Sequence, residues 1–68
     1  AADFLVHELV ALGLLTARPA EPEACVQQAL AACGLQGLAW RSVATLSGGE
    51  RARAQLARAL VQIDAFSQ

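Results

Sequence analysis

Lysine is absent from this sequence of 68 residues, and all five of its basic residues are arginines. Without lysine the chain cannot contain the phosphate-binding loop G-x-x-x-x-G-K-[ST], in which lysine reaches the β- and γ-phosphates of a nucleotide. β-branched residues are also few: five valines, one isoleucine and two threonines. They are too few for a sheet of several strands. The sequence therefore excludes a P-loop within the chain and argues against a β fold.

Charge and long apolar runs are scarce as well. Six acidic residues against five arginines give a net charge of -1, unlike the basic surface of a protein that binds nucleic acid. The longest apolar runs, Leu9–Leu15 and Ala29–Leu35, cover seven residues each, whereas a membrane-spanning helix needs about 18 or more. We therefore expect no nucleic-acid partner and no membrane-spanning helix.

Residues for metal and disulfide chemistry are few. His7 is the only histidine, so a zinc cluster would need ligands from elsewhere. Cys25 and Cys33 are eight residues apart on one expected helix, a rise of roughly 12 Å that exceeds the reach of a disulfide. We expect no metal site, and we interpret both cysteines as small buried thiols.

What the chain has in abundance is alanine, the strongest helix former. The spacing of apolar residues predicts a first helix over Val6–Leu15 and a second over 23–33, which ends at a left-handed Gly34. Residues 35–40 should form a single helical turn and residues 41–45 an extended approach to a third, longest helix. The predicted fold is all-α, with three main helices.

The third helix has a polar and an apolar stripe in its sequence. The polar stripe consists of Arg51, Gln55, Arg58 and Gln62, and the apolar stripe of Leu56, Ala59, Leu60 and Ile63. We expect the apolar stripe to face the core. We interpret the arginines as a solvated or ion-paired surface rather than a nucleic-acid contact.

The start of the third helix carries the most informative residues. Ser47 and Glu50 fit a capping box, S-x-x-E, but a capping box does not explain Gly48 and Gly49. Each glycine lowers helix stability by about 0.5–1 kcal/mol relative to alanine, unless something must approach the backbone closely. Two interpretations stay open at this point: a tight packing contact, or an anion such as phosphate at the positive helix N-terminus.

Residues 46–60 read Leu-Ser-Gly-Gly-Glu-Arg-Ala-Arg-Ala-Gln-Leu-Ala-Arg-Ala-Leu. This stretch resembles the signature motif of ATP-binding-cassette (ABC) ATPases, the LSGGQ/E turn followed by R-x-R and L-A-R-A-L. Phe4–Gly13 is similar to the F-x-V-x-E-x-V-x-x-G segment that begins the helical subdomain of transporter members. Ala52 departs from the frequent Gln, and Trp40 from a small polar or acidic residue. Within the family the chain looks most like importers of iron chelates, haem and cobalamin.

The resemblance implies that residues 1–68 are the helical signature subdomain of an α/β P-loop ATPase whose Walker A and Walker B parts are absent here. It implies that two such ATPases close head to tail, with Ser47, Gly48, Gly49 and Glu50 at the ATP bound to the partner, where the turn contacts the γ-phosphate in trans. ATP and Mg²⁺ would be cofactors of the parent protein. The 68 residues alone would hold no catalytic residue and no metal ligand, and should be inactive.

The resemblance also implies a peripheral position at the cytoplasmic face of the inner membrane, next to transmembrane permease subunits. Val6, Leu9 and Val10 of the first helix are the candidate docking residues. Two alternatives remain. A soluble ABC ATPase of the repair or translation type shares the signature but has no need of the segment at Phe4–Gly13. In a helical interaction module without enzymatic activity, the Ser-Gly-Gly turn would be only a cap.

Overall fold

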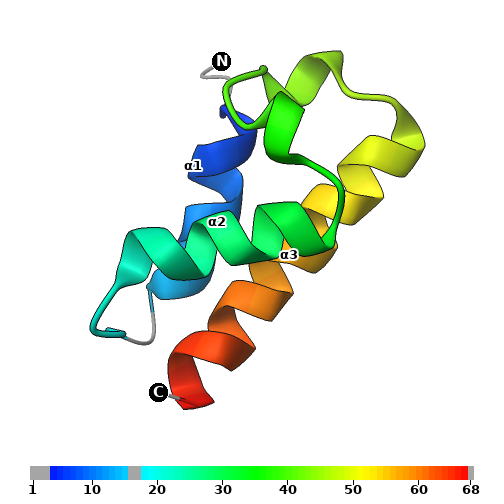
Figure 1. The fold of residues 1–68 in the computed structure, drawn as a ribbon. Coiled ribbons are helices and arrows are strands. Elements are labelled where there is room, and N and C mark those ends of the chain that lie inside the picture. The colour runs from blue at the N-terminus through cyan, green and yellow to red at the C-terminus, as the bar shows by residue number, and fades with distance from the viewer. Residues whose placement is uncertain (1–3, 16–17, 68) are drawn as a thin grey trace.

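The computed structural model describes residues 4–15 and 18–67, with side chains described as far as residue 63. The described residues form three α-helices joined by short 3-10 turns and contain no strand beyond one isolated bridge (Figure 1). The expected all-α fold with three main helices is confirmed. The elements are α1 (Val6–Ala11), η1 (Leu12–Leu14), α2 (Pro22–Ala32), η2 (Gln36–Leu38), η3 (Val43–Thr45) and α3 (Gly48–Ser67).

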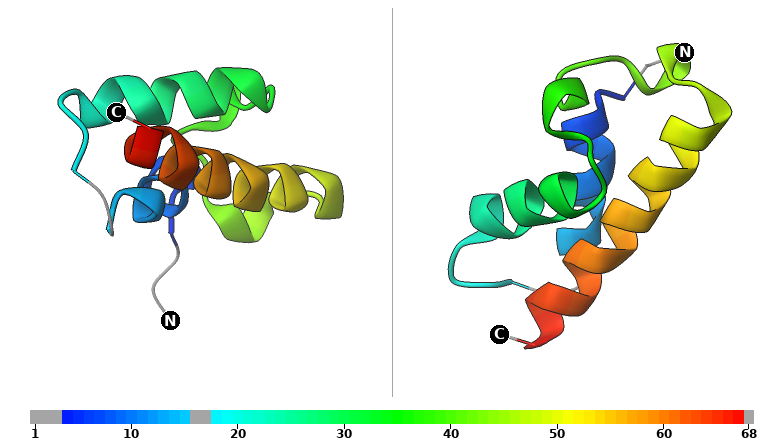
Figure 2. Two further views of the ribbon diagram at one scale, coloured as in Figure 1. Left: turned by 90° about the horizontal axis from the view of Figure 1, so that it is seen from below. Right: turned by 45° about the vertical axis from the view of Figure 1, so that its right-hand side comes forward.

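The three α-helices all pack against one another, and α3 runs along both of the shorter ones (Figure 2). Their buried side chains form one hydrophobic core, and no polar or charged residue is buried among those described. Leu35 and Leu46 add side chains from the segment that joins α2 to α3. The helices contribute Val6, Leu9, Val10, Val26, Ala29, Leu30, Ala54, Ala57 and Val61.

The side of α3 that faces this core is not the one the sequence predicted. Ala54, Ala57 and Val61 are fully buried, whereas Leu56 and Ile63 are 55% and 60% exposed. Ala59 is also exposed and Leu60 is half-buried. The prediction that the Leu56 stripe faces the core is therefore wrong. Gly13 of η1 lies directly against the α3 backbone at Arg58 and beside Val61, and this contact turns the Val61 side of α3 toward the core.

The other expected elements are largely confirmed. The first helix is α-helical only as far as Ala11 and continues as the 3-10 turn η1. Gly34 has the predicted left-handed conformation, with φ 68°, at the end of α2. Residues 36–38 form the predicted single turn, and both cysteines are buried and form no disulfide.

The approach to α3 is only partly extended. Ser42 and Leu46 have extended backbone, but Val43–Thr45 between them form a 3-10 turn. Hydrogen bonds within the segment explain the difference, since Ser42 Oγ accepts from the backbone N–H of Ala44 at 3.2 Å. The Thr45 hydroxyl also donates to the Ser42 carbonyl oxygen at 2.7 Å.

Candidate functional site at the start of α3

The turn that begins α3 is anchored at its base and exposed at its tip. Leu46, immediately before the turn, is 6% exposed and belongs to the hydrophobic core. Farther upstream, the backbone N–H of Val6 donates to the carbonyl oxygen of Arg41 at 2.9 Å, and that of Val43 donates to Phe4 at 2.8 Å. The approach to the turn is thus tied to the entry into α1. Residues 47–49 themselves are exposed.

The predicted capping box is present with both of its hydrogen bonds. The backbone N–H of Glu50 donates to Ser47 Oγ at 3.1 Å, and the backbone N–H of Ser47 donates to Glu50 Oε1 at 2.9 Å. The first helical hydrogen bond follows from Arg51 N–H to the Ser47 carbonyl oxygen at 2.9 Å. These bonds fix the backbone of the turn and the direction in which the helix leaves it.

The same contacts lower the pKa of Glu50 below its ordinary value of 4.5. The main cause is the hydrogen bond from the backbone N–H of Ser47, which favours the ionised carboxylate. Desolvation is the second-largest effect and raises the pKa, whereas the Ser47 hydroxyl and the nearby Arg41 and Arg53 guanidinium groups lower it further. Glu50 is therefore ionised at neutral pH, and its carboxylate is engaged with the turn.

Gly48 and Gly49 are required neither by backbone conformation nor by packing in this chain. Neither has a positive φ; among the described glycines, only Gly34 has one. A Cβ atom built at either position would meet no described atom within 4 Å. The structure shows no tight intramolecular contact there. The close packing left open by the sequence analysis would therefore have to come from outside the described residues.

The turn presents several hydrogen-bond donors to solvent. Nothing in the described part of the chain accepts a hydrogen bond from the backbone N–H of Gly48 or Gly49. Ser47 Oγ accepts one bond and its hydroxyl also acts on the Glu50 carboxylate, so the two glycine amides are the donors that the turn leaves without an acceptor among the described residues. These donors lie at the positive end of a helix of 20 residues. Such an arrangement suits an oxyanion, and phosphate is the usual one at helix N-termini.

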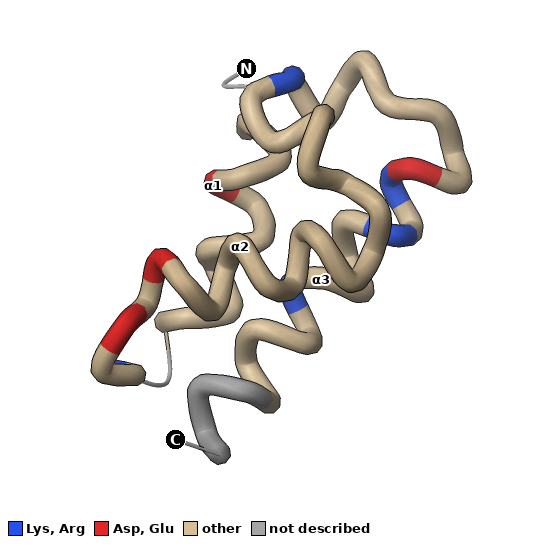
Figure 3. The backbone as a smooth tube through the Cα atoms, viewed as in Figure 1, with Lys and Arg blue, Asp and Glu red and all other residues tan. Residues whose placement is uncertain are grey.

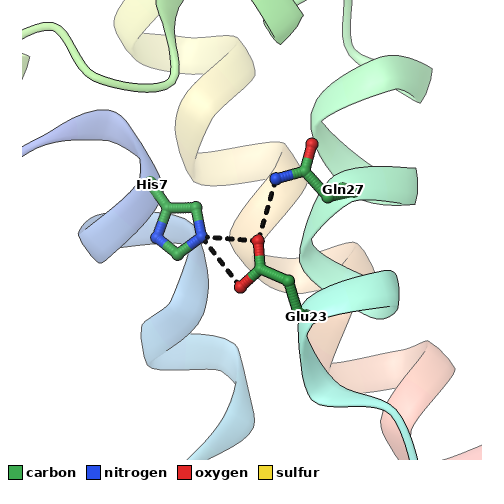
Figure 4. Close-up of polar contacts among 3 residues, drawn as sticks. All are labelled: His7, Glu23 and Gln27. Carbon is green, nitrogen blue, oxygen red and sulfur yellow. Dashed lines mark hydrogen bonds and ion pairs between the residues drawn. The ribbon is translucent and has the colours of Figure 1, made fainter.

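A second cluster joins α1 and α2 (Figure 4) and extends to Trp40, which follows η2. The Nε2 atom of His7 lies 3.0 Å from Glu23 Oε2, and Gln27 Nε2 donates to the same oxygen at 2.9 Å. The His7 ring also stacks on Trp40, with ring centroids 4.8 Å apart and an angle of 14° between the planes. The sequence analysis did not predict this cluster, since no short-range spacing links residues so far apart in the chain.

The three candidate docking residues of α1 lie in the core rather than on the surface. Val6 and Val10 are fully buried, and Leu9 is 7% exposed. Their side chains pack inward, because the helix must bury its apolar face against α2 and α3. They are therefore not available for contact with another subunit in this fold. The exposed positions near them are Glu8 and Trp40, which is 68% exposed.

Comparison with known proteins finds relatives over most of the length of this chain. Over 60 residues the chain is 50% identical to the hemin import ATP-binding protein HmuV of Jannaschia sp. (strain CCS1), a match that covers 88% of this chain and 22% of that protein. It is 47% identical over 62 residues to HmuV of Ruegeria sp. (strain TM1040), covering 91% and 24%. It is 46% identical over 66 residues to the ferric enterobactin transport ATP-binding protein FepC of Escherichia coli (strain K12), covering 88% and 24%.

The chain thus spans about a quarter of the length of these relatives. No protein-family model matches it. Of the helices in the described residues, none has both the length and the apolar character needed to cross a membrane.

Proposed function

The chain is homologous to part of the ATP-binding proteins of ABC transporters in the haem and iron-chelate branch, and on this premise we propose that it is the helical signature subdomain of such an ATPase. In the closed dimer of the parent protein, the turn of one subunit covers the γ-phosphate of ATP bound to the other. The Ser47 hydroxyl and the amides of Gly48 and Gly49 are the donors, and Glu50 holds the turn in shape. The parent hydrolyses ATP with Mg²⁺ and couples closure to import.

The observation that carries this proposal is the unexplained pair of glycines. Gly48 and Gly49 lower helix stability, but no backbone strain or packing contact in the described chain requires them. A close approach by a partner's nucleotide does require them, because a side chain would occupy the space of the phosphate. The exposed amides and the helix dipole would then stabilise the negative charge that develops on the γ-phosphate during hydrolysis.

The relatives' names support an importer of haem or another iron chelate over a soluble ATPase of repair or translation. We therefore place the parent at the cytoplasmic face of the inner membrane, bound to permease subunits. With Val6, Leu9 and Val10 in the core, the contact of α1 with a permease would fall to its exposed side near Glu8 and Trp40. The transported compound would be selected by the permease and a binding protein.

The substitution Gly49→Asp in a full-length parent tests the proposal. Such a parent can be built by placing this chain in the matching stretch of the Jannaschia relative. The aspartate adds both a side chain and a negative charge where the phosphate must approach. At an effective dielectric of about 20, like charges about 4 Å apart repel by about 4 kcal/mol, which corresponds to roughly a thousandfold weaker closure.

The two interpretations of the turn predict different results for this variant. A phosphate-binding turn predicts that each monomer still binds nucleotide at its own P-loop while hydrolysis collapses. A turn that is only a helix cap predicts near-normal hydrolysis, because aspartate is well tolerated in the first turn of a helix. Steady-state hydrolysis and nucleotide affinity are measured on the same protein, and retained hydrolysis would overturn the proposal.

A further inference from the structure

Arg41 joins two parts of the molecule through two different groups. Its carbonyl oxygen accepts a hydrogen bond at 2.9 Å from the backbone N–H of Val6, the first residue of α1. Its guanidinium Nη2 atom donates to the carbonyl oxygen of Thr45 at 3.4 Å and to the Thr45 hydroxyl at 3.3 Å. Thr45 lies two residues before Ser47. One residue therefore links the start of α1 to the approach to the turn.

The main chain around Arg41 is held against the start of α1. The backbone N–H of His7 donates to the carbonyl oxygen of Ala39 at 2.8 Å, and that of Val43 donates to Phe4 at 2.8 Å. The carbonyl oxygens of residues 39 and 41 thus satisfy two of the N–H groups that the first turn of a helix leaves without a partner. The main chain at Arg41 is therefore fixed relative to α1.

The segment between Arg41 and the turn has less support at its far end. Leu46 is buried, but Ala44 and Thr45 are exposed. The side-chain hydrogen bonds of Ser42 and Thr45 to the main chain stay within the segment. The Arg41 guanidinium therefore braces Thr45 from the end of the segment that α1 holds.

The charge of Arg41 also acts on the other side of the turn. In the chain, the charged residues nearest the turn are Arg41 before it and Glu50, Arg51 and Arg53 after it, and Figure 3 shows charged residues gathered at the start of α3. Arg41 and Arg53 both help to lower the pKa of Glu50, whose carboxylate accepts the hydrogen bond from the Ser47 N–H at 2.9 Å. Arg41 thus acts on residues that lie on both sides of the two glycines.

We propose that Arg41 is a positioning residue for the turn, which holds Thr45 in place relative to α1. The amides of Gly48 and Gly49 then keep the direction in which they meet the partner's γ-phosphate. This role rests on the proposed function, because the direction of the amides matters only if the turn binds phosphate. A single nitrogen atom makes both contacts with Thr45, so the planar fork of arginine is not required and the ammonium group of lysine can replace it.

Three substitutions in the full-length parent test this role. Arg41→Gln removes the charge, and Arg41→Lys keeps a charged donor. Arg18→Gln is the matched control, because Arg18 is exposed and lies in the connection between η1 and α2. We expect Arg41→Gln to lower kcat for ATP hydrolysis about tenfold, since misplaced donors stabilise the transition state less. Arg41→Lys should keep at least about half of kcat, and Arg18→Gln all of it.

The Michaelis constant separates positioning from direct binding of nucleotide. Each subunit binds ATP at its own P-loop, so Arg41→Gln should change KM by less than about twofold. A raised KM with unchanged kcat would overturn the proposal, because Arg41 would then contribute to ground-state binding. Unchanged hydrolysis in Arg41→Gln would overturn it, as would a loss in Arg41→Lys equal to that in Arg41→Gln. So would a thermal midpoint of Arg41→Gln more than about 5 °C below that of the parent, which would indicate a role in the fold as a whole.

A double-mutant cycle with Thr45→Val tests whether Arg41 acts through Thr45. Valine removes the hydroxyl that Arg41 contacts and leaves the carbonyl oxygen. Arg41→Gln should therefore lower kcat by only about threefold in the Thr45→Val background, against about tenfold in the parent. An equal effect of Arg41→Gln in both backgrounds would overturn the action through Thr45.

The results for Arg41 can be told apart from those for the turn itself. If Gly49→Asp abolishes hydrolysis and Arg41→Gln retains it, only the positioning role fails. If Gly49→Asp retains hydrolysis and Arg41→Gln loses it, both proposals fail, because Arg41 would then affect hydrolysis by a route other than the turn.

Discussion

Ser47 and Glu50 each hold the other's backbone N–H, through Ser47 Oγ at 3.1 Å and Glu50 Oε1 at 2.9 Å. This reciprocal pair uses the Glu50 carboxylate and the Ser47 hydroxyl, and it leaves the amides of Gly48 and Gly49 without an acceptor among the described residues. The cap and the proposed phosphate site are therefore different atoms of one turn.

Acid should weaken the cap. The pKa of Glu50 is lower in the folded chain than its ordinary value of 4.5, chiefly because the Ser47 N–H binds the carboxylate. A carboxyl group with a lowered folded pKa contributes its full stabilisation above about pH 4.5 and loses it as the pH falls through the lowered value. Glu50→Gln should therefore be less stable than the unsubstituted chain at pH 7, and the difference should shrink toward pH 3. Urea unfolding at pH 7 and pH 3 measures the difference in unfolding free energy between the two proteins. A difference that does not change with pH would contradict the role of the ionised Glu50 carboxylate in the cap.

Gly13 should tolerate no side chain. A Cβ atom at this position would collide with the Arg58 carbonyl oxygen and lie 3.0 Å from the Cβ of Val61. Because neither the backbone nor a buried valine can move freely, Gly13→Ala should lower the unfolding free energy by about 1–3 kcal/mol. Gly37→Ala is the matched control, since nothing lies within 4 Å of its added Cβ. If both alanine variants are equally stable, η1 does not pack on α3 as described.

The stacked pair His7 and Trp40 should be coupled energetically. The rings overlap at 4.8 Å, but Trp40 is 68% exposed, so the coupling should be near the lower end of the usual range, about 0.5 kcal/mol. A double-mutant cycle with His7→Ala and Trp40→Ala measures it in the 68-residue chain. A cycle between Trp40→Ala and Arg51→Ala serves as the uncoupled control. A coupling free energy of zero for the His7 pair would show that the stacking does not persist in solution.

Most of the fold could be predicted from the sequence because its signals are local. The periodicity around Val6, Gly34 at the end of α2 and the capping box at Ser47 each act within one helical turn, and all three are confirmed. The contacts that bring distant segments together were not predictable in this way. The stacking of His7 on Trp40 depends on how the helices pack, which no short-range spacing encodes.

The prediction for α3 failed for a related reason. Periodicity identifies an apolar stripe but does not say what covers it. The prediction placed the large side chains of Leu56 and Ile63 in the core, whereas the buried residues include the small Ala54 and Ala57. Gly13 lies against the α3 backbone at Arg58 and beside Val61, so the side of α3 that carries Val61 faces the core. At the turn, the sequence located Ser47–Glu50 correctly as a cap. The phosphate-binding role stays a prediction, because the partner's nucleotide lies outside this chain.

The 68-residue chain alone should not bind or hydrolyse ATP measurably. The groups that hold the triphosphate and Mg²⁺ in a P-loop ATPase require a lysine-containing loop that this sequence lacks. Isothermal titration calorimetry of the chain with ATP and Mg²⁺ should give no heat of binding. An affinity in the low micromolar range would mean that the turn binds nucleotide without a partner, contrary to an action in trans.

Mixed dimers of the full-length parent test the central claim most directly, because they separate action in trans from action in cis. One subunit carries Gly49→Asp and the other carries a Walker A lysine substitution that abolishes its own nucleotide binding. In this dimer the single intact P-loop faces the intact Ser47 turn only if each turn serves the partner's site. Action in trans therefore predicts that this dimer traps ATP at its intact P-loop. A dimer that carries both substitutions in one subunit should trap no ATP, because its intact P-loop then faces the substituted turn. Equal trapping in the two dimers, or trapping only when both substitutions share a subunit, would contradict the account.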